Sequence, residues 1–356
     1  MEEQRPTPLV EDIDATRARL EDWFSRQRGT PVSLSTLNIP EATGMSNVTL
    51  LFDIQWQEAG ALRSEACVGR LQPEIAKPVF PAYDLSLQYR LMEQLGAQSE
   101  LPVPGLLGLE TDPDVLGVPF YIMRRVDGRI PADMPPYNMD GWMLQETTPA
   151  QRRDMWNAGV DSMAALHRLD PAKLDLDFLP GADSSATALQ QQLAYWRRYH
   201  DWAMEGRPHQ ICLEALNWLE AHQPSGEPTR LCWGDARIGN IIYGPADSSI
   251  AALLDWEMAV LGNPVQDVAW YCYIDSTFAE GLGMPRLEGL PSYEETARRW
   301  QSASGLAIDD FDYYTLFAGM RYGLILSRIM LATGQEAEIQ ENFACKLLQQ
   351  RLAERR

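Results

Sequence analysis

Two acidic side chains and one amide stand in the order and spacing that phosphoryl transfer requires. Asp235 and Asn240 form an Asp-x-x-x-x-Asn sequence, and Asp255 follows further along the chain. Transfer of a phosphoryl group needs one side chain that orients the attacking hydroxyl and accepts its proton, and others that hold Mg²⁺ on the phosphate oxygens. Mg²⁺ takes hard oxygen ligands, which carboxylate and amide side chains supply. We therefore predict a phosphoryl-transfer site that is built on these three residues.

A hairpin is expected to bring Asp255 back to the other two residues. Residues 241–243 and 251–254 read as short strands, and the Gly-Pro-Ala-Asp sequence at 244–247 is typical of a turn. Each motif alone has an ordinary explanation, because Asp-x-x-x-x-Asn occurs by chance and an aspartate before a turn is a common turn former. Their order, joined by a spacer of hairpin length, favours the catalytic interpretation.

Arg237 lies two residues after Asp235 and is a further candidate for chemistry. An arginine side chain can donate to a transferring phosphate and stabilise the charge that develops there. A surface or structural salt bridge would equally explain an arginine at this position. The sequence leaves the two interpretations open.

Predicted strands precede this cluster, and predicted helices surround it. β-Forming residues at 48–56 and 66–70 indicate two strands, an apolar run at 119–124 indicates another, and leucines at helical spacing indicate a helix over 85–95. Helical periodicity follows over residues 151–169, 187–203, 210–222, 292–304 and 310–333. We predict an α+β fold of two lobes, in which a small sheet-plus-helix lobe over 31–125 precedes a larger helical lobe over 126–356. Residues 1–30 are expected to form an N-terminal helical extension.

Composition and charge argue against several classes of protein. The formal net charge is −20 and no run rich in lysine and arginine is present, which argues against nucleic-acid binding. The five cysteines are scattered without a C-x-x-C pair, which argues against a disulfide framework and against a zinc site. No signal-peptide pattern and no run of about 18 apolar residues is found, so we expect a cytoplasmic protein without a membrane span. The oligomeric state stays open.

The motifs together resemble the aminoglycoside phosphotransferase family of kinase-like enzymes. The resemblance rests on Trp-Gly-Asp-Ala-Arg-Ile-Gly-Asn at 233–240, Leu-Asp-Trp-Glu at 254–257, Gly-Asn-Pro at 262–264 and Asp-Val-Ala at 267–269. It covers nearly the whole chain and is similar in particular to the branch of kinase domains associated with acyl-CoA dehydrogenases. The resemblance implies a protein-kinase-like fold.

The same resemblance implies a role for each residue of the cluster. It makes Asp235 the catalytic base, Asn240 and Asp255 the Mg²⁺ ligands, and Asp267 a structural carboxylate that supports the catalytic loop. Trp233 stands where the family often has histidine. Because the proton is accepted by Asp235, we expect this departure to leave the chemistry intact.

On the nucleotide side, the resemblance points to the strand-rich lobe. The loop before the strand at 48–56 would cover phosphates, with Ser46 and Asn47 as contacts, although an ordinary hairpin turn needs no function. The lysine and glutamate that usually pair in kinase-like folds are replaced by Arg70 and Gln88. We expect Arg70 to contact phosphate and Gln88 to orient it, and a solvated strand end and helix position are the alternative.

The segment after the apolar strand would be the hinge between the two lobes. The resemblance implies that backbone groups of Arg124 and Val126 bind the adenine edge of ATP. A purely connective role is the alternative for this segment.

Several polar and aromatic residues are candidates for the acceptor side. They are Tyr271, Tyr273, Asp275, Tyr313, Tyr314, Arg321, Tyr322 and Arg328. Aromatic residues at helical spacing belong more often to a core than to a pocket, so none is assigned. His167 is expected to be a structural histidine with satisfied hydrogen bonds.

We predict an ATP- and Mg²⁺-dependent phosphotransferase that acts on a hydroxyl group of a small molecule. The acyl-CoA-dehydrogenase branch favours a hydroxyacyl-CoA-type metabolite, for which Arg321 and Arg328 could form a local basic patch. An aminoglycoside or another antibiotic is the alternative, which the net charge of −20 would favour. A nucleotide-binding protein without turnover is a third hypothesis, motivated by Arg70 and Gln88.

Overall fold

The computed structural model describes residues 12–40, 47–73, 75–183, 185–245 and 249–355 of the chain. The chain divides into two compact units. The first consists of Met1–Glu93 and Pro104–Val126, and the second of Gln94–Val103 and Asp127–Arg356. The nucleotide candidate Ser46 lies outside the described residues.

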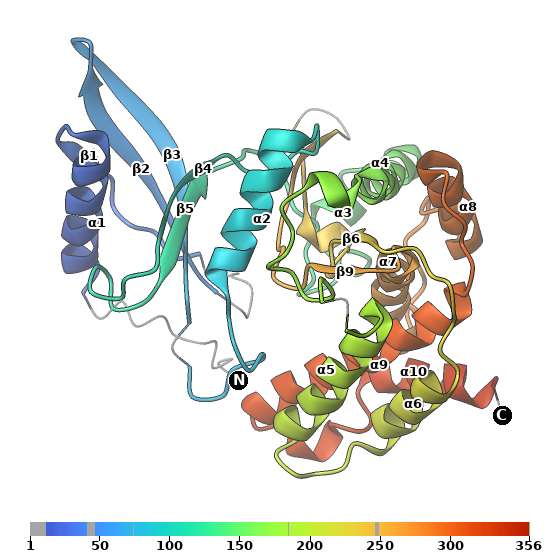
Figure 1. Ribbon diagram of the computed structural model, residues 1–356. Helices are drawn as coiled ribbons and strands as arrows, with labels where there is room; N and C mark the ends of the chain where they lie inside the picture. Colours follow the sequence, from blue (N-terminus) through green and yellow to red (C-terminus); the bar gives the residue numbers. More distant parts are fainter. Residues whose placement is uncertain (1–11, 41–46, 74, 184, 246–248, 356) are drawn as a thin grey trace. The chain divides into compact units, whose positions relative to one another are not determined.

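A five-stranded antiparallel sheet forms the centre of the first unit (Figure 1). The strands are β1 (Val32–Leu34), β2 (Val48–Glu58), β3 (Ala61–Leu71), β4 (Leu106–Glu110) and β5 (Phe120–Arg124), in the order β1-β2-β3-β5-β4. The long hairpin of β2 and β3 pairs residues from Val48 with Leu71 to Glu58 with Ala61.

Helix α1 (Ile13–Arg28) covers one face of this sheet. Leu50 and Ile122 point to that face and pack in one core with Trp23 of α1. The Trp23 ring meets Phe120 edge-on, with 5.1 Å between the ring centroids. The helix predicted within residues 1–30 therefore belongs to the hydrophobic core of the first unit.

The opposite face of the sheet meets the first turns of α2 (Leu85–Gln98). Arg70 on β3 is the register partner of Thr49 on β2 and of Tyr121 on β5. Residues directly opposite each other in a sheet point to the same face. The hydroxyl of Tyr121 donates to Gln88 Oε1 of α2 at 3.3 Å, so α1 and α2 cover opposite faces (Figure 1).

Helices make up most of the second unit (Figure 1). They are α3 (Trp142–Gln145), α4 (Pro149–Arg168), α5 (Ala188–Ala203), α6 (Gln210–Ala221), α7 (Val265–Phe278), α8 (Tyr293–Ser304), α9 (Phe311–Ala332) and α10 (Phe343–Ala353). Two short antiparallel ladders lie among them, β6 (Arg230–Cys232) with β9 (Val260–Gly262) and β7 (Ile241–Tyr243) with β8 (Ile250–Leu253). Short 3₁₀ turns occupy Pro171–Lys173, Ile238–Asn240, Glu280–Leu282 and Glu336–Glu338.

Helix α9 is the central helix of the second unit and packs against α6, α7 and α10. Within the described residues it is also the one helix whose length and composition would allow it to cross a membrane. Of its most apolar 18-residue window, 78% is buried inside the protein. A buried core helix passes the same test, so α9 carries no argument for a membrane.

Most predicted elements are present with shifted ends. The predicted hairpin is confirmed, because Ile241 of β7 pairs with Leu253 of β8. The sequence did not predict β4, β9, α3, α7 or α10. Every residue of α7 is buried, so the helix shows no alternation of apolar and polar residues from which its period could be recognised.

Candidate active site

The candidate catalytic loop, residues 233–240, connects β6 to β7 and turns at Gly234. This residue has a φ of +87°, and a Cβ atom on it would lie 1.9 Å from the carbonyl oxygen of Met258. Only glycine has the required freedom at positive φ and the required lack of a side chain. The loop ends in a 3₁₀ turn, in which the backbone N–H of Asn240 donates to the Arg237 carbonyl at 2.9 Å.

Three donors from the second unit fix the carboxylate of Asp235. Arg237 Nε and Asn240 Nδ2 donate to Asp235 Oδ2 at 2.9 Å and 2.8 Å. The indole Nε1 of Trp270 in α7 donates to Asp235 Oδ1 at 2.8 Å. Both carboxylate oxygens are therefore held in place before any substrate arrives, as a preorganised base requires.

Arg237 is shared between two carboxylates. Besides Asp235, its guanidinium binds Asp133, which lies in the segment between β5 and α3. Burial alone would lower the pKa of Arg237, but the charges of Asp235 and Asp133 raise it well above its ordinary value. The salt bridge that the sequence left open as an alternative is thus present.

Asp267, in the first turn of α7, lies under the catalytic loop. Its Oδ2 accepts from the backbone N–H of Trp233 at 2.6 Å, and its Oδ1 accepts from that of Gly234 at 3.0 Å. His167 Nε2 is 3.0 Å from the same Oδ2, and the indole N–H of Trp300 donates to His167 Nδ1 at 2.9 Å. Since Nδ1 accepts, Nε2 carries the proton, and His167 is a structural histidine with both ring nitrogens satisfied.

The end of the β7–β8 hairpin brings Asn240 and Asp255 to one place. The backbone N–H of Leu254 donates to the Asn240 carbonyl at 2.9 Å. Trp233 Nε1 donates to the Leu254 carbonyl at 2.8 Å, so the residue that replaces the usual histidine ties the loop to the hairpin. Asp255 itself has a φ of 62°, a left-handed conformation that costs a non-glycine residue about 1–3 kcal/mol and that recurs at functional sites.

The oxygen atoms of this cluster fit a magnesium ion. With the amide nitrogen of Asn240 donating to Asp235, the oxygen is the atom of Asn240 that a cation would bind. Asp255 supplies a carboxylate beside it. Two such hard ligands, completed by phosphate oxygens and waters, are the usual protein contribution to Mg²⁺.

A buried arginine of α9 supports the loop from the other side. Arg321 Nη2 donates to the Gly234 carbonyl at 2.9 Å. Its guanidinium lies 4.5 Å from the ring centroid of Trp270 and 5.3 Å from that of Trp196. Removal from water lowers the pKa of Arg321 to about 10. The arginine and the tryptophan that binds Asp235 are therefore packed as one unit.

The residues considered for the acceptor side belong to the core. All of them except Tyr322 are buried. Asp275 is bound by Arg286 and by the hydroxyl groups of Tyr137 and Tyr293. Arg328 pairs with Glu205 at 2.7 Å. Arg321 and Arg328, which were considered as a local basic patch, are both buried within the second unit and do not form an exposed one.

Within the first unit, the nucleotide candidates Arg70 and Gln88 lie on the same face of the sheet. Arg70 Nη1 donates to Thr49 Oγ1 at 2.9 Å. Gln88 is buried on α2, and its link to the sheet is Tyr121, the register neighbour of Arg70. Asn47, just before β2, is also buried.

Arg124 and Val126 follow at the end of β5. The backbone N–H of Arg124 donates to the Gly105 carbonyl at 2.7 Å, and that of Arg125 donates to Ala66 at 2.9 Å. The side chain of Arg124 forms an ion pair with Glu65. The N–H of Arg124 is therefore engaged by Gly105 and does not face an adenine edge.

Asp133, Trp270 and Arg321 contact the site but were not assigned to it from the sequence. Trp270 follows Asp267 by three residues, a spacing that places both side chains on one side of a helix. That signal could have found Trp270 if α7 had been predicted. Asp133 and Arg321 carry no such signal, because they approach the loop from distant segments of the chain.

Comparison with known proteins agrees with this geometry. The model of the phosphotransferase enzyme family matches residues 76–301. The chain belongs to this family. Its fold is protein-kinase-like.

The relatives and solved structures agree with the family. The probable acyl-CoA dehydrogenase IBR3 of Arabidopsis thaliana is 27% identical over 88% of this chain and 39% of its own length. A Ralstonia eutropha protein assigned as an aminoglycoside phosphotransferase has a TM-score of 0.67 and 22% identity, over 94% of this chain and 98% of that one.

A ternary complex of a thermostable mutant of aminoglycoside phosphotransferase APH(4)-Ia with AMP-PNP and hygromycin B has a TM-score of 0.57. Its identity is 16%, over 93% of this chain and 98% of that one. The chain spans 39% of the length of the probable acyl-CoA dehydrogenase that it matches.

Proposed function

We propose that this phosphotransferase uses ATP and Mg²⁺ to phosphorylate a hydroxyl group of a small-molecule metabolite. The observation that carries the proposal is the Asp235 carboxylate, held by Arg237, Asn240 and Trp270 beside the hairpin that ends at Asp255. A scaffold that only bound nucleotide would have no need of this arrangement.

In the proposed reaction, Asp235 orients the acceptor hydroxyl and takes its proton. The acceptor oxygen forms a bond to the γ-phosphorus while the bond from that phosphorus to the β–γ bridging oxygen breaks, and ADP leaves. Arg237 holds the base through Nε and is proposed to donate to the transferring phosphate through its remaining N–H groups. A bound Mg²⁺ supplies charge neutralisation on the phosphates, and Asn240 and Asp255 are the residues proposed to hold it.

For the nucleotide, we propose Arg70 as a phosphate contact, with Gln88 as its neighbour on the same face of the sheet. Ser46 and Asn47 are the proposed loop contacts, and the backbone of Val126 is proposed to bind adenine. Support for ATP comes from the structural neighbour that binds AMP-PNP.

For the acceptor, we propose a hydroxyacyl-CoA-type metabolite. Its support is the similarity to a probable acyl-CoA dehydrogenase over most of the chain. An aminoglycoside is the second candidate, because a structural neighbour binds hygromycin B. One assay separates the two candidates, because each acceptor is offered to the enzyme separately.

The test measures ATP consumption with hydroxyacyl-CoA esters and aminoglycosides in parallel, for the wild type and for Asp235→Asn. Loss of a positioned general base should lower turnover about 10²–10⁴-fold. The exposed variant Asp161→Asn, whose side chain pairs with Arg299 on the surface, should keep full turnover.

Equal turnover in the wild type and in Asp235→Asn would refute Asp235 as the base. Mg²⁺-dependent ATP binding without transfer to any acceptor of the panel would instead support a nucleotide-binding protein without turnover.

A further inference from the structure

Asp133 lies outside the candidate catalytic loop and meets it through one side chain. Its Oδ2 accepts from Nη1 of Arg237, and its Oδ1 is buried without a hydrogen-bond partner. Among the residues that the structure describes, Arg237 is therefore the one hydrogen-bond partner of this carboxylate. No step of the proposed phosphotransfer uses Asp133, so we expect any effect of this residue on the reaction to pass through Arg237.

The segment that carries Asp133 is fastened to the second unit on both sides of this residue. Before it, the backbones of Arg129 and Tyr243 exchange hydrogen bonds of 2.8 Å and 2.9 Å, and Tyr243 ends β7, the strand that follows the catalytic loop. After it, Asn138 Nδ2 donates to the Phe278 carbonyl of α7 at 2.8 Å. The backbone around Asp133 is thus fixed against β7 and α7, the two elements that adjoin the catalytic loop.

The guanidinium of Arg237 is held at two of its three nitrogens. Nε donates to Asp235 Oδ2 at 2.9 Å, and Nη1 donates to Asp133. Nη2 makes no hydrogen bond to any residue that the structure describes. Because the Arg237 side chain is 21% exposed, a ligand can reach it.

The two carboxylates compete for this guanidinium. An arginine that meets a single carboxylate commonly binds it with two N–H groups at once. A closed pair of that kind with Asp235 would take up Nη2 of Arg237 together with Nε, and neither group would be left for a phosphate. The bond from Nη1 to Asp133 holds the guanidinium toward a second carboxylate and so opposes the closed pair.

Gly239 leaves the space in which Arg237 and Asp133 meet. A Cβ atom on it would lie 2.7 Å from Arg237 Nη1 and 2.7 Å from Asp133 Oδ1. Both atoms are the ends of flexible side chains, so an added methyl group would displace the ion pair and not the backbone. The contact can therefore be changed from a third position without the removal of a charge.

We propose that Asp133 is a positioning residue for phosphoryl transfer. It holds Arg237 by Nη1 and leaves Nη2 to donate to the phosphoryl group while that group moves from ATP to the acceptor. The inference rests on the proposed function. A donor that is aimed at the moving group acts mainly on the transition state, so Asp133 should affect transfer and not the binding of the nucleotide.

The probe is MgADP with aluminium fluoride, whose planar anion mimics the phosphoryl group in transfer, and it needs no acceptor. Calorimetry on the full chain measures the Kd of MgADP with and without fluoroaluminate. We expect the anion to tighten MgADP binding in the wild type, and Asp133→Asn to reduce this gain about tenfold to a hundredfold. The Kd of MgADP alone should stay unchanged, and Asp133→Glu, which keeps the carboxylate, should recover part of the gain.

Two glycine variants test the same contact by shape. Gly239→Ala keeps both charges and should reduce the fluoroaluminate gain as Asp133→Asn does. Gly96→Ala, on α2, is the matched control, because a Cβ atom there would lie 3.6 Å from Val103 in ordinary contact. It should leave both affinities as they are in the wild type.

Arg237→Gln shows whether Asp133 acts through the arginine. In that background Asp133→Asn should change the fluoroaluminate gain no further, because residues that act as one unit are not additive. An equal loss from Asp133→Asn with and without Arg237 would overturn the proposal. So would a wild type without any gain, or a gain that Asp133→Asn and Gly239→Ala both leave unchanged.

The proposed function fails on a different result, which is equal turnover of ATP in the wild type and in Asp235→Asn. If turnover is lost in Asp235→Asn and kept in full by Asp133→Asn, the phosphotransferase stands and only the role of Asp133 is refuted. With an acceptor that is turned over, the expected result for Asp133→Asn is a fall in kcat by the same factor as the fluoroaluminate gain, at an unchanged KM for ATP.

Discussion

The carboxylate of Asp235 is held by residues from two parts of the second unit, and each contact has a separate effect. Arg237 and Asn240 come from the same loop, whereas Trp270 comes from α7. Trp270 fixes Oδ1, while the other two donors fix Oδ2. Trp270 therefore orients the Asp235 carboxylate. Because the indole is uncharged, a substitution of Trp270 can test that role without removing charge.

Replacing Trp270 by phenylalanine removes the indole N–H and keeps an aromatic ring under Arg321. A hydrogen bond to a charged group contributes about 1.5–3 kcal/mol, so we expect the kcat of phosphotransfer to fall roughly tenfold to a hundredfold. The KM for ATP should stay close to that of the wild type. Steady-state kinetics check this, with Trp202→Phe on α5 as the control.

An unchanged kcat in Trp270→Phe would show that Oδ1 needs no donor. A change confined to the KM for ATP would place Trp270 in nucleotide binding instead.

Gly234 is the second residue on which the loop depends. In Gly234→Ala, the new Cβ would lie 1.9 Å from the Met258 carbonyl, so the loop must move. Gly206 has a similar φ of +80°, and a Cβ atom on it would meet nothing within 4 Å, which makes Gly206→Ala a matched control for backbone strain alone. We expect Gly206→Ala to lose about 1–2 kcal/mol of unfolding free energy and Gly234→Ala to lose more, together with activity, as measured by urea unfolding and by turnover.

At the scale of elements, helix α9 links the catalytic loop to the rest of the second unit. Arg321 in its middle bonds the loop, and Tyr314 near its start bonds Glu227, which precedes β6. Asn263 Nδ2 also donates to Glu227 at 2.8 Å. The strand that leads into the catalytic loop is thus fastened to α9 at both of its ends.

The buried carboxylate of Glu227 is expected to make the stability of the protein depend on pH. Burial raises the pKa of Glu227 above its ordinary value of 4.5, so its contribution to stability is present at low pH and is lost as the pH rises through the raised value. Glu227→Gln keeps acceptors for Tyr314 and Asn263 without charge. We expect its unfolding free energy relative to wild type to increase from pH 4 toward pH 7, as measured by denaturant unfolding at several pH values.

The exposed variant Glu294→Gln, on the surface of α8, is the control for removing a carboxylate outside the core. A difference between Glu227→Gln and wild type that stays constant with pH would contradict the prediction.

At the scale of the whole molecule, the chain is strongly acidic and yet buries most of its aromatic residues in two separate units. The C-terminal helix α10 belongs to the helical core, since it packs against α6, α7 and α9. Its Leu348 is fully buried. The second unit therefore extends to the end of the described chain.

Truncation of the Leu348 side chain measures how much α10 contributes to the free energy of unfolding. Leu348→Ala should lower the unfolding free energy by about 2–5 kcal/mol, because a buried leucine leaves a cavity. Leu62 is 63% exposed, and Leu62→Ala should stay within roughly 0.5 kcal/mol of wild type. Urea unfolding monitored by helical circular dichroism compares the two. Equal stability of both variants would show that α10 is not part of the cooperative core.

The sequence by itself determined that the chain is a phosphotransferase of two-lobed fold, and it indicated most of the helices and strands. Asp235, Asn240 and Asp255 could be recognised because the loop and the β7–β8 hairpin are local in the chain, and local spacing fixes their geometry. The strands and amphipathic helices could be recognised for the same reason, since a half-buried face leaves a period in the residue types. Helix α7 left no period because it is buried on all sides.

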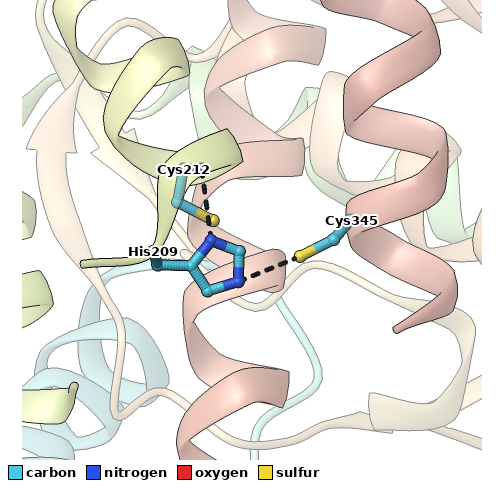
Figure 2. A group of neighbouring side chains, drawn as sticks. All are labelled: His209, Cys212 and Cys345. Atoms are coloured by element: carbon cyan, nitrogen blue, oxygen red, sulfur yellow. Dashed lines mark hydrogen bonds between the residues drawn. The ribbon is translucent and has the colours of Figure 1, made fainter. Parts of the chain in front are cut away.

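Only the tertiary structure decided which distant residues complete the site. Asp133 bonds a residue 104 positions away in the catalytic loop, and Arg321 bonds one 87 positions away, and no spacing rule connects such positions. For the same reason, the fold packs the buried side chains of His209, Cys212 and Cys345 together (Figure 2), although no short motif joins them in the sequence. These neighbours are set by long-range packing. Such packing depends on how whole helices fill the core and not on which residues are adjacent in the sequence.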